Sequence, residues 1–60
     1  MTKQQAEWAS KHDWFIGQVA IGNGNFKVTV EESEFDEEDN YHYFVVSFTD
    51  FQKLKEWAGY

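Results

Sequence analysis

The stretch Ile21-Gly22-Asn23-Gly24-Asn25-Phe26 decides the fold, because it contains a strong signal for a tight turn between two strands. An Asn-Gly pair suits a type I′ turn, whose two central residues both need positive φ. Placing Asn23-Gly24 at the turn fixes which residues of the two strands face each other. The predicted pairs are Gly22 with Asn25, Ile21 with Phe26, Val19 with Val28, Gly17 with Val30, and Phe15 with Glu32.

Outward from this turn, residues 14–21 and 26–32 alternate between apolar and polar side chains, as half-buried strands do. A third strand is expected over residues 41–48, so the sequence predicts a three-stranded antiparallel sheet. The predicted core face of that sheet carries Phe15, Val19, Ile21, Phe26, Val28, Val30, Phe44, Val46 and Phe48.

The other face of the predicted sheet is also rich in large apolar side chains. It carries Trp14, Ile16, Tyr41, Tyr43 and Val45. Helices packed on both faces would cover this second face, whereas helices that share one face would leave it exposed as a contact surface. We expect the covered arrangement.

A helix is expected at the N-terminal end, over residues 3–12. Thr2 and Gln5 have the spacing of a capping box, in which each side chain accepts a hydrogen bond from the other residue's backbone N–H. The residues that follow are good helix formers and include no Gly or Pro.

A second helix is expected over residues 50–58. Thr49 and Gln52 repeat the capping-box spacing before it, and Gly59 marks its end. The predicted fold class is therefore α+β, a single small domain over residues 1–60 in the order α-β-β-β-α. In it, a three-stranded antiparallel meander packs with N- and C-terminal helices.

The composition limits how such a small domain is stabilised. There is no cysteine, so disulfides are excluded, and stability must come largely from six Phe, three Tyr and three Trp side chains. No apolar run approaches the roughly 20 residues of a membrane span, and the first ten residues do not resemble a signal peptide. We therefore expect a cytoplasmic protein that does not enter a membrane.

Negative charge is concentrated in the acidic segment, residues 31–40. Seven of the eleven acidic residues lie there without a single Lys or Arg: Glu31, Glu32, Glu34, Asp36, Glu37, Glu38 and Asp39. The other fifty residues hold all five lysines and four acids, which leaves a charge of +1 outside the segment. The sequence leaves open whether residues 31–40 form a hairpin tip or a flexible loop.

The acidic segment has two competing interpretations. It can be a contact surface for a basic protein, with Phe35, Tyr41 and Tyr43 as the apolar anchors of the complex. The predicted partner-binding residues are then the seven acids together with these three aromatic residues. Alternatively, the carboxylates only keep an aromatic-rich chain in solution.

Metal binding and catalysis find little support in the sequence. Asp36, Glu38 and Asn40 alternate as the first ligands of a calcium loop do, but Tyr41 stands where the loop needs glycine. The adjacent His12 and Asp13 do not face each other at a helix end, so we expect His12 to be structural. We predict no catalytic residue, no metal site and no cofactor.

The order of the elements resembles that of the double-stranded RNA-binding fold, but that fold needs basic phosphate contacts that this acidic chain does not offer. We therefore expect no direct nucleic-acid binding. In size and charge the chain resembles phage or mobile-element inhibitors that mimic DNA, which implies a basic, nucleic-acid-handling protein as partner. The alternative is a small accessory or self-associating domain, which can form a homodimer.

Overall fold

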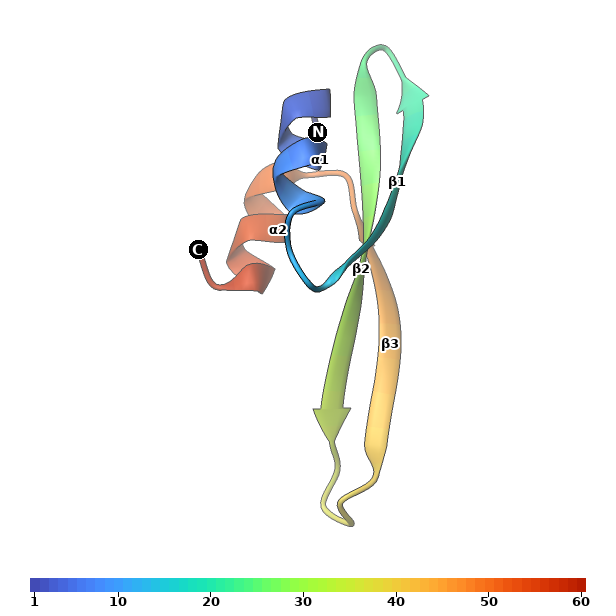
Figure 1. Ribbon diagram of the computed structural model, residues 1–60, viewed down its shortest axis with the longest axis vertical. Coiled ribbons are helices and arrows are strands. Elements are labelled where there is room, and N and C mark those ends of the chain that lie inside the picture. Colours follow the sequence, from blue (N-terminus) through green and yellow to red (C-terminus); the bar gives the residue numbers. More distant parts are fainter.

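The computed structural model describes all 60 residues and contains two helices and one three-stranded sheet (Figure 1). The elements are α1 (Lys3–Ala9), β1 (Phe15–Gly22), β2 (Asn25–Phe35), β3 (Tyr41–Phe48) and α2 (Phe51–Ala58). The strands are antiparallel in the order β1-β2-β3. The predicted α-β-β-β-α fold is confirmed. Neither helix has the length and apolar character needed to cross a membrane.

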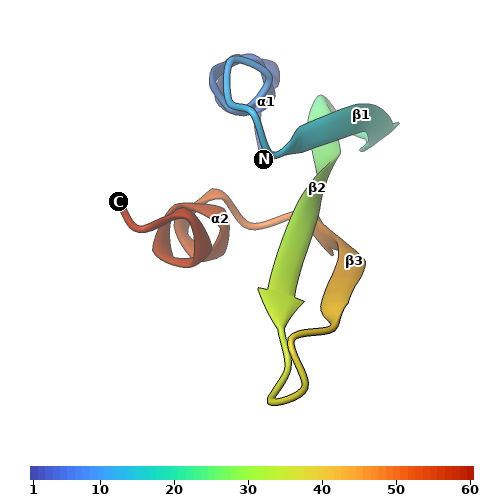
Figure 2. The same cartoon turned by 60° about the horizontal axis from the view of Figure 1, so that its bottom comes forward.

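Both helices pack on the same face of the sheet (Figures 1 and 2). Val28 and Val30 of β2 are fully buried in one cluster with Ala6 and Ala9 of α1 and Leu54 of α2. We call this side of the sheet the helix face and the opposite side the open face. The second face was expected to be covered, and that expectation is wrong, because no element is left to pack against it.

Helix α1 begins as predicted but ends three residues early. The Thr2 hydroxyl accepts from the Gln5 N–H at 3.2 Å, and Gln5 Oε1 accepts from the Thr2 N–H at 2.8 Å. At the other end of the helix, side chains donate hydrogen bonds to the last backbone carbonyl groups. Ser10 Oγ donates to Glu7 O, and His12 Nδ1 donates to Trp8 O at 3.0 Å. The backbone N–H groups of Lys11 and His12 donate to Trp8 O and Ala9 O in a tighter pattern of bonds, and the α-helix ends at Ala9.

Helix α2 is capped by Asp50, so the capping box predicted at Thr49 is wrong. Asp50 Oδ1 accepts from the N–H groups of Gln52 at 2.9 Å and Lys53 at 3.4 Å. A carboxylate is well suited to this place, because the helix N-terminus presents unpaired N–H groups and a partial positive charge. The predicted end at Gly59 is confirmed, since that residue is left-handed with φ +91°.

The predicted turn at Asn23-Gly24 is present, but the predicted register beyond it is wrong. Asn23 and Gly24 have φ values of +52° and +75°, as a type I′ turn requires, and Gly22 faces Asn25. Two irregularities then each place an extra residue in β1. The observed pairs are Ala20 with Phe26, Val19 with Lys27, Gln18 with Val28, Gly17 with Thr29, and Phe15 with Val30.

These irregularities decide which side chains of β1 reach the core. A slip of one residue moves a strand side chain to the opposite face of the sheet. The slip between Ala20 and Gly22 therefore puts Gln18, instead of Val19, opposite the buried Val28. Val19 and Ile21, which were predicted to lie in the core, are 50% and 51% exposed. The second slip brings Phe15 opposite Val30 on the helix face.

The core is confined to the part of the sheet that the helices cover. Its six buried residues are Met1, Ala6, Ala9, Val28, Val30 and Leu54. Half-buried aromatic side chains surround this cluster, including Trp14, which packs at 5.3 Å from the ring of Trp57. Trp14 therefore does not belong to the second apolar face on which it was predicted. Phe44, predicted as a core residue, is 44% exposed because it lies beyond the helices.

Met1 forms backbone hydrogen bonds with Phe26, on the edge of β2 that faces away from β1. Met1 O accepts from the Phe26 N–H at 2.7 Å, and the Met1 amino group donates to Phe26 O and Thr49 O. The Phe26 N–H therefore points away from β1 and toward the β3 side of the sheet.

Candidate functional site

The β2–β3 hairpin continues well past both helices and forms a free arm (Figures 1 and 2). We define the arm as residues 31–45, in which Glu31–Phe35 pair with Tyr41–Val45 and residues 36–40 form the tip. The molecule is consequently elongated, measuring 45 × 21 × 17 Å. Strand β2 runs three residues further than predicted. Half of the acidic segment is therefore strand, and the other half is the hairpin tip.

The acidic residues can remain in strand β2 because neither side of the arm is buried. Glu31 pairs with Val45 and Glu32 with Phe44, which are residue types that favour strands, and Glu34 pairs with His42. The carboxylates stay in water on both faces, so pairing of the backbone does not require burial of charge.

The tip is closed by the carboxylate of Asp36. Oδ1 accepts from the N–H groups of Glu38 at 2.8 Å and Asn40 at 2.9 Å. The backbone N–H of Asp36 also donates to Asn40 O at 3.0 Å. These bonds define one loop conformation and leave the side chains of the next three acids free to face water.

The second oxygen of Asp36 pairs with His42. The distance from Asp36 Oδ2 to His42 Nε2 is 2.8 Å, and this is the one side-chain ion pair of the molecule when the imidazole is protonated. The hydrogen bond from His42, followed by those from Asn40 and Glu38, lowers the pKa of Asp36 below its ordinary value of 3.8. The His42 ring in turn stacks over Phe44, with centroids 6.4 Å apart.

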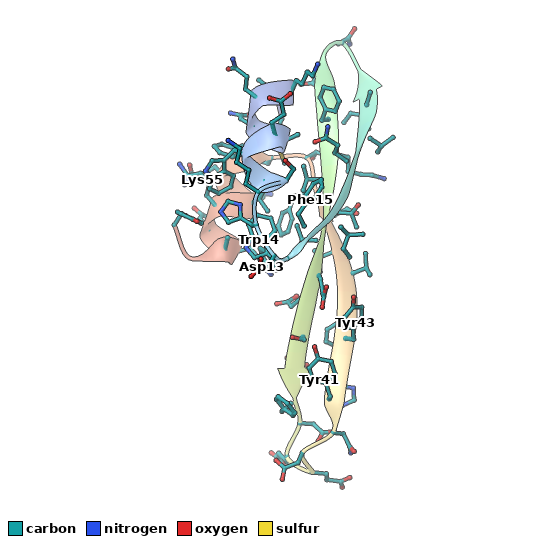
Figure 3. All side chains as sticks on the ribbon, in the orientation of Figure 1. Asp13, Trp14, Phe15, Tyr41, Tyr43 and Lys55 are labelled. Atoms are coloured by element: carbon teal, nitrogen blue, oxygen red, sulfur yellow. The ribbon has the colours of Figure 1, made fainter.

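The open face of the arm carries a row of exposed apolar side chains, which we call the aromatic row: Phe35, Tyr41, Tyr43 and Val45. Figure 3 labels the two tyrosines of this row. Phe35 is 70% exposed and Tyr43 is 54% exposed. The rings of Phe35 and Tyr41 meet edge to face at 5.4 Å, and Tyr41 lies 6.5 Å from Tyr43. The row is continuous and uncovered.

One carboxylate belongs directly to the aromatic row. Glu31 faces Val45 across the sheet and lies diagonally next to Tyr43 on the open face. Hydrogen bonding to Glu31, followed by desolvation of the phenol and by the negative charge of that carboxylate, raises the pKa of Tyr43 above its ordinary value of 10.0. The phenol of Tyr43 therefore holds its proton more firmly than an ordinary tyrosine does.

The structure divides the predicted partner-binding residues into three groups. Glu31, Phe35, Tyr41 and Tyr43 share the open face, whereas Glu32 and Glu34 lie on the opposite side beside Phe44 and His42. Glu37, Glu38 and Asp39 are exposed at the tip. The carboxylates thus surround the arm on both sides and at its end.

Two residues of the arm were missed as candidates for partner binding. Val45 continues the aromatic row and is 60% exposed, and its period-two spacing from Tyr41 and Tyr43 could have included it. His42 holds Asp36, and no local pattern in the sequence indicates a bond between residues six positions apart across a loop.

His12 lies away from the arm and both of its ring nitrogens are engaged. A carbonyl oxygen only accepts, so Nδ1 carries the proton that is donated to Trp8 O. In the neutral ring, Nε2 accepts from the Tyr60 hydroxyl at 2.7 Å. The ring also stacks on Trp14 at 4.5 Å. These contacts join the end of α1 to the end of the chain.

The surface has no pocket, and no three His, Cys, Asp or Glu side chains gather as a possible metal site. Comparisons with protein-family models, with curated proteins and with solved structures found no match for this chain.

Proposed function

We propose that this chain is a protein-binding module whose arm contacts a basic protein. The observation that carries the proposal is the aromatic row, an uncovered apolar surface flanked by Glu31 and by the acids of the tip. Exposed apolar patches rimmed by polar groups are typical of protein contacts. Arg and Lys side chains can both stack on such rings and pair with neighbouring carboxylates.

The partner that best suits this surface is a nucleic-acid-handling protein in the cytosol. Such proteins present grooves of Lys and Arg that bind phosphates. An arm with carboxylates on both sides and at its tip can enter a groove of this kind as a narrow negative rod. We accordingly propose that the chain occupies a nucleic-acid site and inhibits its owner, as a DNA mimic from a phage or another mobile element would.

Self-association is the competing function, and the exposure of Phe35, Tyr43 and Val45 supports it. A second copy could cover this row and bury apolar surface. Each chain carries a net charge of −6, however, because the arm contributes −7 and the rest of the chain +1. Two arms brought together would repel each other, so a basic partner is the better complement.

The test compares two triple variants of equal charge. The first, E37Q/E38Q/D39N, removes three of the four negative charges of the tip and spares Asp36. The control, E7Q/D13N/E56Q, removes three charges outside the arm and spares the helix cap Asp50. The immobilised chains are exposed to a nuclease-treated bacterial lysate at low and at high salt, and the captured proteins are identified.

We expect the control and the unmodified chain to capture the same basic proteins, with release by salt and by duplex DNA. The tip variant should associate with them about tenfold more slowly at low salt, because charge mainly governs the encounter. Tyr43→Ala should instead accelerate dissociation, and it should weaken the free energy of binding by about 2 kcal/mol if the ring is a central anchor. Equal capture by the tip variant and the unmodified chain would show that the acids serve only solvation.

A further inference from the structure

The outer edge of β3 has unpaired backbone groups along most of its length. The Glu31 N–H donates to Trp14 O at 2.7 Å, so the polar groups of Glu31 point toward β1. Its cross-strand partner in β3 is Val45, which therefore points its own N–H and C=O away from the sheet. By the alternation of an antiparallel ladder, the same outward direction holds for Tyr41, Tyr43 and Ser47.

This edge lacks the features that usually block strand addition. Proteins protect exposed edges with charged residues, prolines, bulges or a covering element. Strand β3 contains no Lys, Arg, Asp, Glu, Gly or Pro, and its pairing with β2 runs without a register shift. Both helices lie on a face of the sheet and leave the edge open (Figure 2). The opposite edge, β1, is distorted by two register shifts.

We propose that the outer edge of β3 binds an extended, Lys- or Arg-rich segment of the partner by β-strand addition. The proposal rests on the proposed function, because it takes the partner to be basic. It adds the mode of recognition: the added strand pairs with the outward N–H and C=O groups of Tyr41, Tyr43 and Val45. Affinity then comes from the backbone as well as from the side chains.

Charge complementarity favours a basic segment over a second copy of this chain. An added strand lies about 10 Å from β2, two strand spacings away, so long side chains on it can reach across β3. On the open face such a side chain passes Val45 to reach Glu31. On the other face it passes over the ring of Phe44 to reach Glu32. A second copy would instead bring another charge of −6 to this edge.

The test measures backbone amide exchange by NMR with a defined probe, the peptide acetyl-(Arg-Val)₄-amide. We expect the amides of Tyr43 and Val45 to exchange at least about tenfold more slowly when the peptide is bound, because they gain hydrogen bonds. The amide of Ala20 is the control. It faces Phe26, whose N–H points away from β1, so the Ala20 N–H points outward from the opposite edge of the sheet.

A backbone substitution made by chemical synthesis gives a second readout. Val45→N-methylvaline removes one outward donor and keeps the side chain, and Ala20→N-methylalanine makes the same change on the opposite edge. The first should weaken binding of the peptide about fivefold or more, and the second should leave it unchanged. Equal affinities of the two methylated chains would contradict strand addition.

The exchange experiment also separates this proposal from the proposed function. Salt-sensitive binding that shifts the ring signals of Phe35 and Tyr43, but leaves the Tyr43 and Val45 amides unprotected, would overturn strand addition alone. The arm would then bind through its side chains. Absence of any salt-sensitive binding to the arm would overturn both proposals. Protection of these amides without peptide, rising with chain concentration, would mean that a second copy occupies the edge and would overturn the basic segment.

Discussion

Asp36 is the residue on which the shape of the tip depends. Its two carboxylate oxygens have separate tasks, since Oδ1 binds the N–H groups of Glu38 and Asn40 and Oδ2 binds His42. The neighbouring Glu37 and Asp39 share its charge but not its bonds. Replacing one acid of the tip is therefore not equivalent to replacing another.

We expect Asp36→Asn to loosen the tip and Glu37→Gln to leave it unchanged, although each removes one negative charge. The neutral side-chain oxygen of Asn accepts the two backbone hydrogen bonds more weakly than a carboxylate does, and the amide cannot form an ion pair with His42. Amide exchange at Glu38 and Asn40 measures the difference by NMR. Equal exchange rates in the two variants would show that Asp36 has no special role.

The same bonds predict how the tip responds to acid. The carboxylate form accepts them, and the pKa of Asp36 in the folded chain is lower than its ordinary value of 3.8. Their contribution is therefore complete above pH 3.8 and is lost as the pH falls through the lowered pKa. An NMR titration of the Asp36 carboxyl carbon should show this shift in the unmodified chain.

At the scale of elements, the register of β1 separates two valines that the sequence makes look equivalent. In a regular hairpin, Val19 and Val28 would both face the core. In the structure, Val28 is fully buried and Val19 is half-exposed. The extra residue between Ala20 and Gly22 is the cause. The alternation of side chains predicts strands well, but it cannot reveal an inserted residue that reverses the alternation.

We expect Val28→Ala to destabilise the chain by about 2 kcal/mol, through lost burial and the cavity left behind. Val19→Ala removes the same two methyl groups and should change the free energy of unfolding by no more than about 0.5 kcal/mol. Chemical denaturation of both variants measures the two values. A regular hairpin, with both valines in the core, would give similar losses.

Features that depend on neighbouring residues could be predicted from the sequence, whereas features that depend on distant residues could not. The Asn23-Gly24 turn, the Thr2 cap and the Gly59 helix end depend on neighbouring residues, and all three are confirmed. The end of α1 depends on His12 reaching back to Trp8 O, in competition with continued helix. The exposure of Phe44 depends on where the helices stop covering the sheet, which no local pattern encodes.

At the scale of the whole molecule, the buried core that stabilises the fold and most of the acidic residues lie in different parts of the structure. The helices and the neighbouring part of the sheet hold the core, while the arm projects beyond them and carries seven of the eleven acidic residues (Figures 1 and 3). The sequence predicted this concentration of charge. It did not predict that β2 would continue to Phe35, because that extension depends on pairing with Tyr41–Val45.

We propose that the arm, and no other part of the surface, contacts the partner. Two exposed tyrosines allow a matched test, since Tyr43 lies on the arm and Tyr60, which is 66% exposed, lies at the end of the chain. Each is replaced in turn by the photoreactive p-benzoylphenylalanine, and the chain is irradiated in a nuclease-treated lysate. We predict that the Tyr43 position crosslinks to a basic protein in a salt-sensitive manner, whereas the Tyr60 position does not. Crosslinks from Tyr43 only to a second copy of the chain, or crosslinks to the same protein from Tyr60 alone, would contradict the claim.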